Sequence, residues 1–540
     1  MSLLQSSSAK YTVPILSIVA FLIPLAIMVG KVLEHTHGVF AYPLDDSYIH
    51  LAVAKNLTVN SVWGISGHEF ASASSSILYP LLLSGIFKIT GVVTIIPFLV
   101  NLAVAIVFLL VVQRWLVRQG IAPAGQLIVL LLAIFLIPLP GIVMVGMEHT
   151  LHLLFFFLFL TSFSDVLEKM VAAPGQPVKM TWPVYVYGVL MMAARFESMA
   201  LLGFACVLLV FHRRWIAALQ LGFVCFLPVL IFGIVSISKG GFFLPNAVML
   251  KPSLPSGGLD EMIYYIREEY FPRFFSGSER YNTLGVQRLL LLIPLTYFLF
   301  RKATREKMGY QYMLLLLFAA TIFHLAFAAY SFYARYEVYL VGSFVVVAST
   351  LFVKYFRVEA ADRNGAPEWV GWLLGVFLLA PLVTRSWNVF DQVALGSIWT
   401  YDQQCQMGKF VQQYYDWDGV VFNDIGGVSY FSEGKKLDIL GLGNNDVAQQ
   451  RRQRMNTPDL IDSLGKAKDA KIAIVYEPRF KNYTRNWRKV ASWDIPYDDP
   501  IGFYDSVTFY AVNPGDAPML MNNLKKYQPS LPKEIVVRYY

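Results

Sequence analysis

The stretch Tyr42-Pro43-Leu44-Asp45-Asp46-Ser47-Tyr48-Ile49-His50 follows directly after the first long apolar segment of the chain. Two adjacent carboxylates beside a bilayer are costly to hold near lipid and add nothing to packing there. The pair therefore indicates a reaction or a bound cation at the membrane surface. A helix cap or an ordinary loop acid is the plainer alternative for Asp45 and Asp46.

The composition is that of a polytopic membrane protein. Of 540 residues, 56% are hydrophobic and only 15% are charged, and the mean hydropathy is +0.52, far from an ordinary soluble chain. The net charge is +8, but Lys and Arg in membrane proteins gather in cytoplasmic loops, so the excess predicts topology and no nucleic-acid partner. The 3 cysteines provide neither a disulfide framework nor a zinc site.

Apolar segments long enough to cross a bilayer recur along the first 386 residues. The predicted crossings, eleven in all, are 12–33, 92–113, 126–145, 149–166, 182–197, 198–212, 216–238, 287–300, 309–330, 337–353 and 369–386. The first segment is expected to stay as an anchor, since no small-residue cleavage pattern follows it. Segment 77–90 is short and carries Pro80 and Lys88, so we expect it to be interfacial or re-entrant.

The basic residues fix the expected orientation in a cell (inner) membrane. With the N-terminus inside, the loops that carry Arg114, Arg213 and Arg301 all fall on the cytoplasmic side. Residues 1–388 form the predicted membrane domain, with a first outer loop at 34–76. Residues 389–540 alternate short apolar runs with charged helical stretches, which predicts a soluble α/β or α+β domain on the outer side.

Polar residues that interrupt the apolar runs gather on the outer edge of this topology. Acids and bases from distant segments would thus line one chamber at the membrane face. Besides Asp45 and Asp46 they are Glu148, His149, Arg195, Glu197, Asn246, Lys251, Arg335 and Tyr336. Each has a plainer explanation: Arg195 and Glu197 pairing with one another, Glu148 and His149 forming a polar turn, and Lys251 and Arg335 snorkelling to the interface.

Such a chamber suits transfer of a group to a hydroxyl. A carboxylate in a partly dehydrated site takes a proton from an attacking sugar hydroxyl as general base. Lys251 and Arg335 would then stabilise the charge on a phosphate leaving group. The second acid either raises the pKa of the first or helps to hold a divalent cation, and the sequence leaves both open. If a helix begins at Asp46, His50 lies one turn further on and either shares a proton or hydrogen bond with it or faces solvent.

The motifs resemble those of the GT-C superfamily of membrane glycosyltransferases, and most closely bacterial proteins similar to the mycobacterial terminal arabinofuranosyltransferase. The resemblance rests on the Asp-Asp-Ser-Tyr-Ile element at 45–49 and on motifs spread over most of the chain. These are Ser74 to Leu83, Gly146-Met147-Glu148, Arg195-Phe196-Glu197, Leu244-Pro245-Asn246 with Lys251, Arg335-Tyr336 and Asp424 to Phe431. Phe196 stands where the family often has Pro, and Ser47 where a small Ala is common.

The resemblance implies an inverting transfer from a polyprenyl-phosphate-linked sugar to a glycan, glycolipid or protein acceptor on the outer face. Asp45 would be the base, and Asp46 would orient the acceptor or a cation. Lys251, Arg335 and Arg195 are the expected ligands of the donor phosphate. The expected substrate-binding residues are His50, Glu148, His149, Glu197, Asn246 and Tyr336.

Two other functions stay open at this stage. A transporter or flippase of a lipid-linked saccharide would show paired halves and broken helices at the bilayer midplane, whereas the polar residues here lie at one edge. A binding or assembly protein would leave the chamber acids without a chemical role. No nucleotide-binding pattern occurs, which favours a lipid-phosphate donor over a nucleotide sugar.

Overall fold

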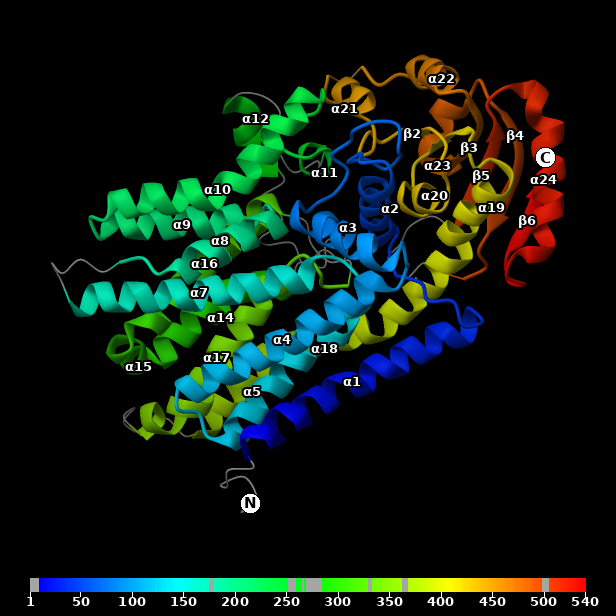
Figure 1. The fold of residues 1–540 in the computed structure, drawn as a ribbon. Helices are drawn as coiled ribbons and strands as arrows, with labels where there is room; N and C mark the ends of the chain where they lie inside the picture. The colour runs from blue at the N-terminus through cyan, green and yellow to red at the C-terminus, as the bar shows by residue number, and fades with distance from the viewer. Residues whose placement is uncertain are drawn as a thin grey trace.

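A computed structural model describes residues 9–173, 179–250, 259–264, 267–268, 284–328, 333–361, 368–453, 455–497 and 505–540. A helical part holds most of the chain, and a sheet domain at the C-terminal end sits on one end of it (Figure 1). The first turn of helix α1 and the C-terminal domain lie on different sides of the helical part (Figure 1).

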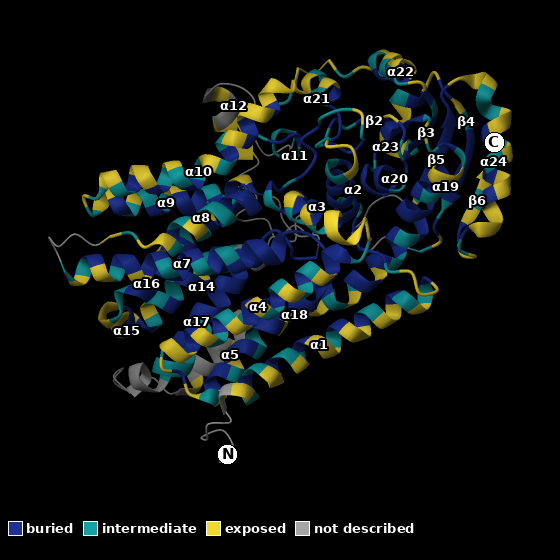
Figure 2. Ribbon diagram, in the orientation of Figure 1, coloured by how far each residue is buried: buried dark blue, intermediate teal, exposed yellow. Residues whose placement is uncertain are grey.

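Long apolar helices dominate the helical part. Within the described ranges, six are long and apolar enough to cross a membrane. They are α1 (Ala9–His35), α4 (Ile96–Arg118), α7 (His149–Ala172), α10 (Trp215–Ser238), α16 (Met308–Phe327) and α17 (Val338–Ala361). The outer faces of α1 and α10 are exposed (Figure 2), although they carry Ile23, Ile27, Leu219 and Phe223. Exposed apolar faces of this kind are covered by lipid, so the chain is a multi-pass membrane protein.

Several predicted crossings are interrupted. The segment predicted at 126–145 is split into α5 (Pro123–Leu136) and α6 (Leu139–Val145), which meet at 46°. Pro138 and Pro140 remove backbone donors at this bend. Shorter apolar helices are α3 (Leu78–Thr90), α8 (Trp182–Ala194), α9 (Ser198–Phe211) and α14 (Leu284–Leu299). Length and composition therefore do not show which of these shorter helices cross the membrane. The number of eleven crossings stays a prediction.

The remaining helices of this part are short or lie at its edge. They are α11 (Asn246–Met249), α12 (Leu259–Tyr264) and α15 (Arg301–Glu306). Helix α18 (Glu368–Thr400) is the longest and runs without a break through the predicted boundary at residue 388. It continues through a π-helical turn, Tyr401–Cys405, into α19 (Gln406–Tyr414). An almost continuous helix thus connects the membrane helices to the soluble domain.

The C-terminal domain contains a six-stranded mixed sheet of order β2-β1-β3-β5-β4-β6. The strands are β1 (Gly419–Phe422), β2 (Lys436–Asp438), β3 (Ala470–Val475), β4 (Arg488–Asp494), β5 (Ser506–Ala511) and β6 (Val536–Tyr539). Strand β1 pairs parallel with β2 and β3, and the other pairings are antiparallel. The accompanying helices are α20 (Gly426–Phe431), α21 (Asn445–Arg452), α22 (Pro458–Ala467), α23 (Glu477–Phe480) and α24 (Ala517–Tyr527). The predicted α/β or α+β domain is thereby confirmed.

Helix α2 (Asp45–Val59) joins the two parts. All ten residues from Ser47 to Asn56 are buried, and α2 lies between the helical part and the sheet domain (Figures 1 and 2). Near its C-terminal end, the Lys55 ammonium donates to the Tyr430 carbonyl at 2.7 Å and pairs with Glu433 at 2.7 Å. Its N-terminal end, which carries the two acids, is therefore held at the junction of both parts.

Candidate active site

The two adjacent acids at the start of α2 serve different partners. Successive side chains on a helix point about 100° apart, so neighbours do not share a face. Asp45 turns to the soluble domain and Asp46 turns to the membrane domain. The two carboxylates therefore do not form a joint clamp.

Asp45 is a cap for a helix of the other domain. Its two carboxylate oxygens accept hydrogen bonds from the backbone N–H groups of Gly426 at 2.6 Å and Gly427 at 2.7 Å. These groups open α20 and would otherwise lack partners. Burial, and then the negative charge of Asp424, raise the pKa of Asp45 well above its usual range. The capping alternative is thus what the structure shows, with the cap reaching across the domain junction.

Asp46 is the accessible acid. Its side chain is 43% exposed, and its Oδ2 atom accepts a 2.6 Å hydrogen bond from the buried Arg335 guanidinium. Arg335 also donates to the Tyr336 hydroxyl at 2.8 Å and lies over the Tyr336 ring. A charge-assisted bond of this kind fixes the carboxylate and leaves Oδ1 available to accept a further proton.

A cavity of about 250 Å³ opens beside Asp46. Its walls come from both domains, which makes it the natural place for a reaction at the junction. The membrane side and the first outer loop provide Asp46, Ile49, His50, Ala73, Ser75, Met147, Ala247, Leu250 and Tyr336, and the soluble domain provides Leu440, Leu442, Arg451 and Arg479.

A buried ionic cluster around Glu148 lies next to the cavity, since its members His50 and Ser75 line the cavity wall. Glu148 is fully buried and accepts hydrogen bonds from Arg195 at 2.6 Å and from Ser75 at 2.7 Å. It also pairs with His50 at 3.0 Å. Although burial opposes ionisation, the charges of His50 and Arg195 hold the pKa of Glu148 well below its usual range. Glu148 is therefore ionised at neutral pH although it is buried.

The structure corrects the expectation for His50 and decides between the alternatives for Arg195. His50 is buried and contacts Glu148 and the Ser74 hydroxyl, at 3.2 Å, so it neither faces solvent nor bonds Asp46. Arg195 donates to both oxygens of Glu197, at 3.0 and 2.6 Å, which is the pairing left open by the sequence. Its guanidinium is thus already neutralised by two carboxylates.

The other expected site residues are spread around the cavity. His149 is buried, and its ring meets the Tyr336 ring edge to face at 5.7 Å. The Asn246 side chain does not line the cavity; it donates to the Leu442 carbonyl at 3.3 Å and to Asn445 at 3.0 Å, tying α11 to the soluble domain. Lys251 lies outside the described residues. Roles for these residues in binding substrate stay predictions.

The sequence analysis missed Arg451 and Arg479. Both line the cavity but belong to the soluble domain, whose position relative to Asp46 no sequence pattern gave. Ser75 was missed as a partner of Glu148, although it stands in the Ser-rich patch 72–76. No signal distinguished these residues from the other polar residues around them.

The described residues offer no ready metal centre. Among them, no three His, Cys, Asp or Glu side chains converge as ligands. Asp45 is engaged by two backbone N–H groups and Asp46 by Arg335, which is a donor set unsuited to a divalent cation. A cation held by the two acids stays a sequence prediction.

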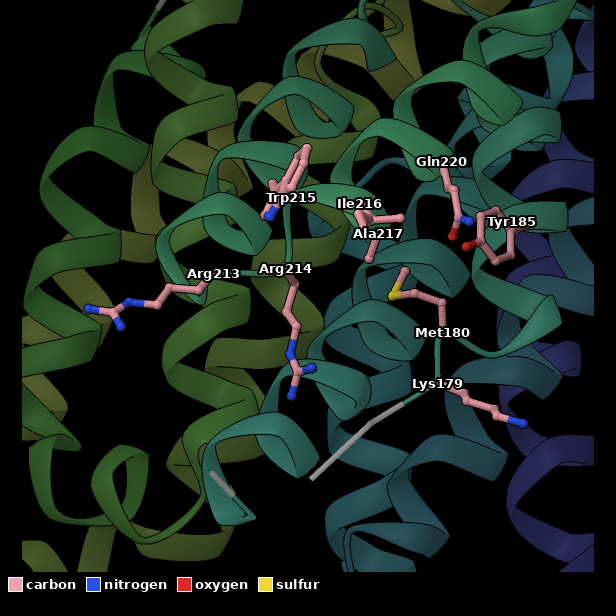
Figure 3. Close-up of a pocket in the computed structure, with 9 residues that line it drawn as sticks. All are labelled: Lys179, Met180, Tyr185, Arg213, Arg214, Trp215, Ile216, Ala217 and Gln220. Atoms are coloured by element: carbon pink, nitrogen blue, oxygen red, sulfur yellow. The ribbon is translucent and has the colours of Figure 1, made fainter. Parts of the chain in front are cut away.

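A larger hollow, of about 460 Å³, lies elsewhere, beside the turn between α9 and α10. Lys179, Arg213 and Arg214 line it with Trp215, but the three basic side chains point in different directions (Figure 3). None of the residues that line it is acidic. The smaller cavity beside Asp46 is therefore the candidate site.

The comparisons with known proteins agree with this architecture. Residues 392–510 match the family described as Domain of unknown function (DUF8728). No curated protein matches the sequence. ArnT from Cupriavidus metallidurans bound to undecaprenyl phosphate superposes with a TM-score of 0.52 at 12% identity, covering 94% of this chain and 99% of that chain. The same protein in its apo state gives 0.51 at 13% identity, with the same coverage.

This chain has the fold of ArnT. The likeness spans both the membrane helices and the soluble domain, because it covers nearly the full length of each chain. It confirms the expected GT-C fold. The narrower resemblance to the mycobacterial terminal arabinofuranosyltransferase stays a prediction.

Proposed function

We propose that this protein is an inverting glycosyltransferase that moves a sugar from a polyprenyl-phosphate donor to a hydroxyl of an envelope glycan, glycolipid or protein. The observation that carries the proposal is the accessible acid Asp46, held by Arg335 at a cavity between the two domains. The ArnT fold supports it, since one ArnT structure holds undecaprenyl phosphate.

The proposed step needs one base and one leaving group. Asp46 takes the proton from the acceptor hydroxyl while the hydroxyl oxygen attacks the anomeric carbon of the donor. The bond between that carbon and the phosphate oxygen breaks, and its electron pair leaves with the polyprenyl phosphate. Attack from the side opposite the phosphate inverts the anomeric configuration.

The geometry favours Asp46 over Asp45, the residue that the family resemblance named as base. Both oxygens of Asp45 accept backbone N–H groups of α20, so proton transfer to Asp45 would weaken the domain junction. Asp46 has one oxygen on Arg335 and faces the cavity. We assign Asp45 the role of positioning α2 against the soluble domain.

The proposed topology places the cavity and the soluble domain outside the cytoplasm. The basic turn at Arg213 and Arg214 lies between α9 and α10, at the end of the helical part away from the soluble domain (Figure 1). Basic turns face the cytoplasm, which supports a periplasmic or external position for the soluble domain.

The test is a transfer assay with the purified full-length protein, a polyprenyl-phosphate sugar and an envelope acceptor extract. The wild type should release polyprenyl phosphate and form a glycoside of inverted configuration, read by mass spectrometry and NMR. Asp46→Asn should lower the rate by about 100- to 10,000-fold, with unchanged donor binding. Donor flipping without a new glycoside would instead identify a flippase and overturn the proposal.

A further inference from the structure

Two arginines of the soluble domain face the same cavity as Asp46. Arg451 is the penultimate residue of α21, and Arg479 is in the short helix α23. Arg451 is half-buried and Arg479 is exposed. They bring two positive charges to a cavity whose membrane side holds the carboxylate of Asp46.

Arg451 is oriented by a backbone hydrogen bond, and Arg479 contacts an aromatic ring. Arg451 donates through Nη1 to the Leu440 carbonyl at 2.6 Å, which orients the guanidinium and leaves its other donors. The Arg479 guanidinium lies 5.4 Å from the centre of the Phe480 ring. Neither forms a salt bridge among the described residues. Two unneutralised like charges beside one cavity favour a bound anion.

Asp438, whose negative charge acts on Arg451, is engaged by backbone groups. Asp438 accepts hydrogen bonds from the backbone N–H groups of Leu440 at 2.7 Å and Gly443 at 2.9 Å. Burial lowers the pKa of Arg451; the negative charge of Asp438 opposes this shift, and the positive charge of Arg479 adds to it to a smaller extent. The cavity therefore contains a guanidinium whose charge is poorly solvated and only partly compensated.

The arginines of the membrane domain are already paired with carboxylates. Arg195 is held by Glu148 and Glu197, and Arg335 is bound to Asp46 itself. A leaving phosphate must stand on the far side of the anomeric carbon from the base. A cation that is bonded to the base cannot meet that requirement without releasing it, whereas arginines from another domain can.

We infer that Arg451 and Arg479 bind the phosphate group of the lipid-linked donor, so that the soluble domain completes the donor site. The inference rests on the proposed function and names the cations that the transfer needs. Arginine binds phosphate through paired, charge-assisted hydrogen bonds, and two guanidinium groups match the charge of a phosphate that leaves as a dianion.

The test compares binding of undecaprenyl phosphate and of undecaprenol, which lacks the phosphate, to the full-length protein in detergent. The double variant Arg451→Gln/Arg479→Gln should bind undecaprenyl phosphate about 10- to 100-fold more weakly and undecaprenol as the wild type does. Double substitution by Lys should restore part of the affinity. Arg452→Gln is the matched control, because Arg452 is adjacent but lies over the Phe242 ring and does not line the cavity.

Equal affinities of the double variant and Arg452→Gln for undecaprenyl phosphate would overturn the inference. A raised KM for the acceptor with unchanged lipid-phosphate binding would also overturn it, because the anion would then belong to the acceptor. The Asp46→Asn protein separates this inference from the proposed function: it should lose transfer but bind undecaprenyl phosphate normally. If the double variant unfolds, Arg479→Gln alone, at an exposed position, should still weaken binding about 10-fold.

Discussion

The Arg335 guanidinium donates a 2.6 Å hydrogen bond to the Asp46 carboxylate, although 289 positions separate the two residues in the sequence. The pair links the start of α2 to the start of α17, and it fixes the accessible acid at the cavity. A charge-assisted hydrogen bond from a buried guanidinium orients the carboxylate, as a general base must be oriented.

Replacing Arg335 by Gln should therefore lower kcat more than it changes the binding of undecaprenyl phosphate. Loss of one charge-assisted bond to the base corresponds to about a 10- to 100-fold decrease in kcat. Arg485→Gln is the control, because Arg485 pairs with Asp459 on the exposed surface and its loss should leave kcat unchanged. An Arg335→Gln protein with wild-type kcat would contradict the proposed role.

Substitutions of the two neighbouring acids, Asp45 and Asp46, should affect different measured properties: stability for Asp45 and transfer rate for Asp46. Asp45→Asn leaves one backbone N–H of α20 facing an amide NH₂ group, which costs about 1–3 kcal/mol of stability. We expect a lower midpoint of thermal unfolding but transfer within about 10-fold of wild type per folded molecule, whereas Asp46→Asn should lose transfer per folded molecule. Loss of transfer in a normally stable Asp45→Asn protein would return the role of base to Asp45.

Gly426 should tolerate no side chain. A Cβ atom there would lie 2.8 Å from the Asp45 Cγ atom and collide with the Asp45 backbone. We expect Gly426→Ala to push α20 away from α2, with a loss of stability of about 1–3 kcal/mol and a fall in transfer rate. Gly515→Ala, in the same domain and with open space around it, should leave the unfolding midpoint and the transfer rate at wild-type values.

The buried cluster around Glu148 should be the most sensitive to neutral substitution. Glu148→Gln removes one of the two carboxylates that hold the buried Arg195 and leaves His50 without its ion pair. Breaking a buried pair from one side costs about 3–5 kcal/mol, so the protein should show a markedly lower unfolding midpoint in detergent. The control is Asp459→Asn, the exposed partner of Arg485, which should change the midpoint by less than a tenth of that effect.

The membrane class, the mixed soluble domain and the GT-C fold were predictable, because apolar length, alternating short runs and ordered motifs are local properties of a sequence. The expected topology put Asp46 and Arg335 on the same edge, but it assigned Arg335 to the donor phosphate and did not predict that the two residues pair. The partner of Asp45 was not predicted either. Asp45 caps α20 only because the soluble domain docks against α2. The sequence Gly426-Gly427 alone indicates no more than a turn.

The cavity wall from the soluble domain was unpredictable for the same reason. Arg451 and Arg479 are ordinary surface arginines by sequence, and only the docking of α21 and α23 against the membrane domain brings them to the cavity. The broken crossings were partly readable, since Pro138 and Pro140 stand inside segment 126–145. Apolar content outweighed them in the sequence analysis, although proline removes a backbone donor from a helix.

Lys436 gives a prediction about pH and stability that is independent of catalysis. It is fully buried in β2, and within the described structure its ammonium has no hydrogen-bond partner. Burial, helped by the positive charge of Lys55, lowers the pKa of Lys436 from 10.5 to about 7. Between these two pKa values the unfolded chain holds a proton that the folded chain has released, so this residue makes stability rise with pH across that window.

Lys436→Met should remove that dependence, because a methionine of similar length has no charge to desolvate. At about pH 7 the variant should be more stable than wild type by on the order of a few kcal/mol. The difference should shrink as the pH rises toward about 9.5, because the deprotonation of Lys436 that accompanies folding costs less as the pH approaches the pKa of 10.5 in the unfolded chain. Thermal unfolding of both full-length proteins in detergent at the two pH values measures this. Equal gains from the substitution at both pH values would show that Lys436 is not the group that titrates.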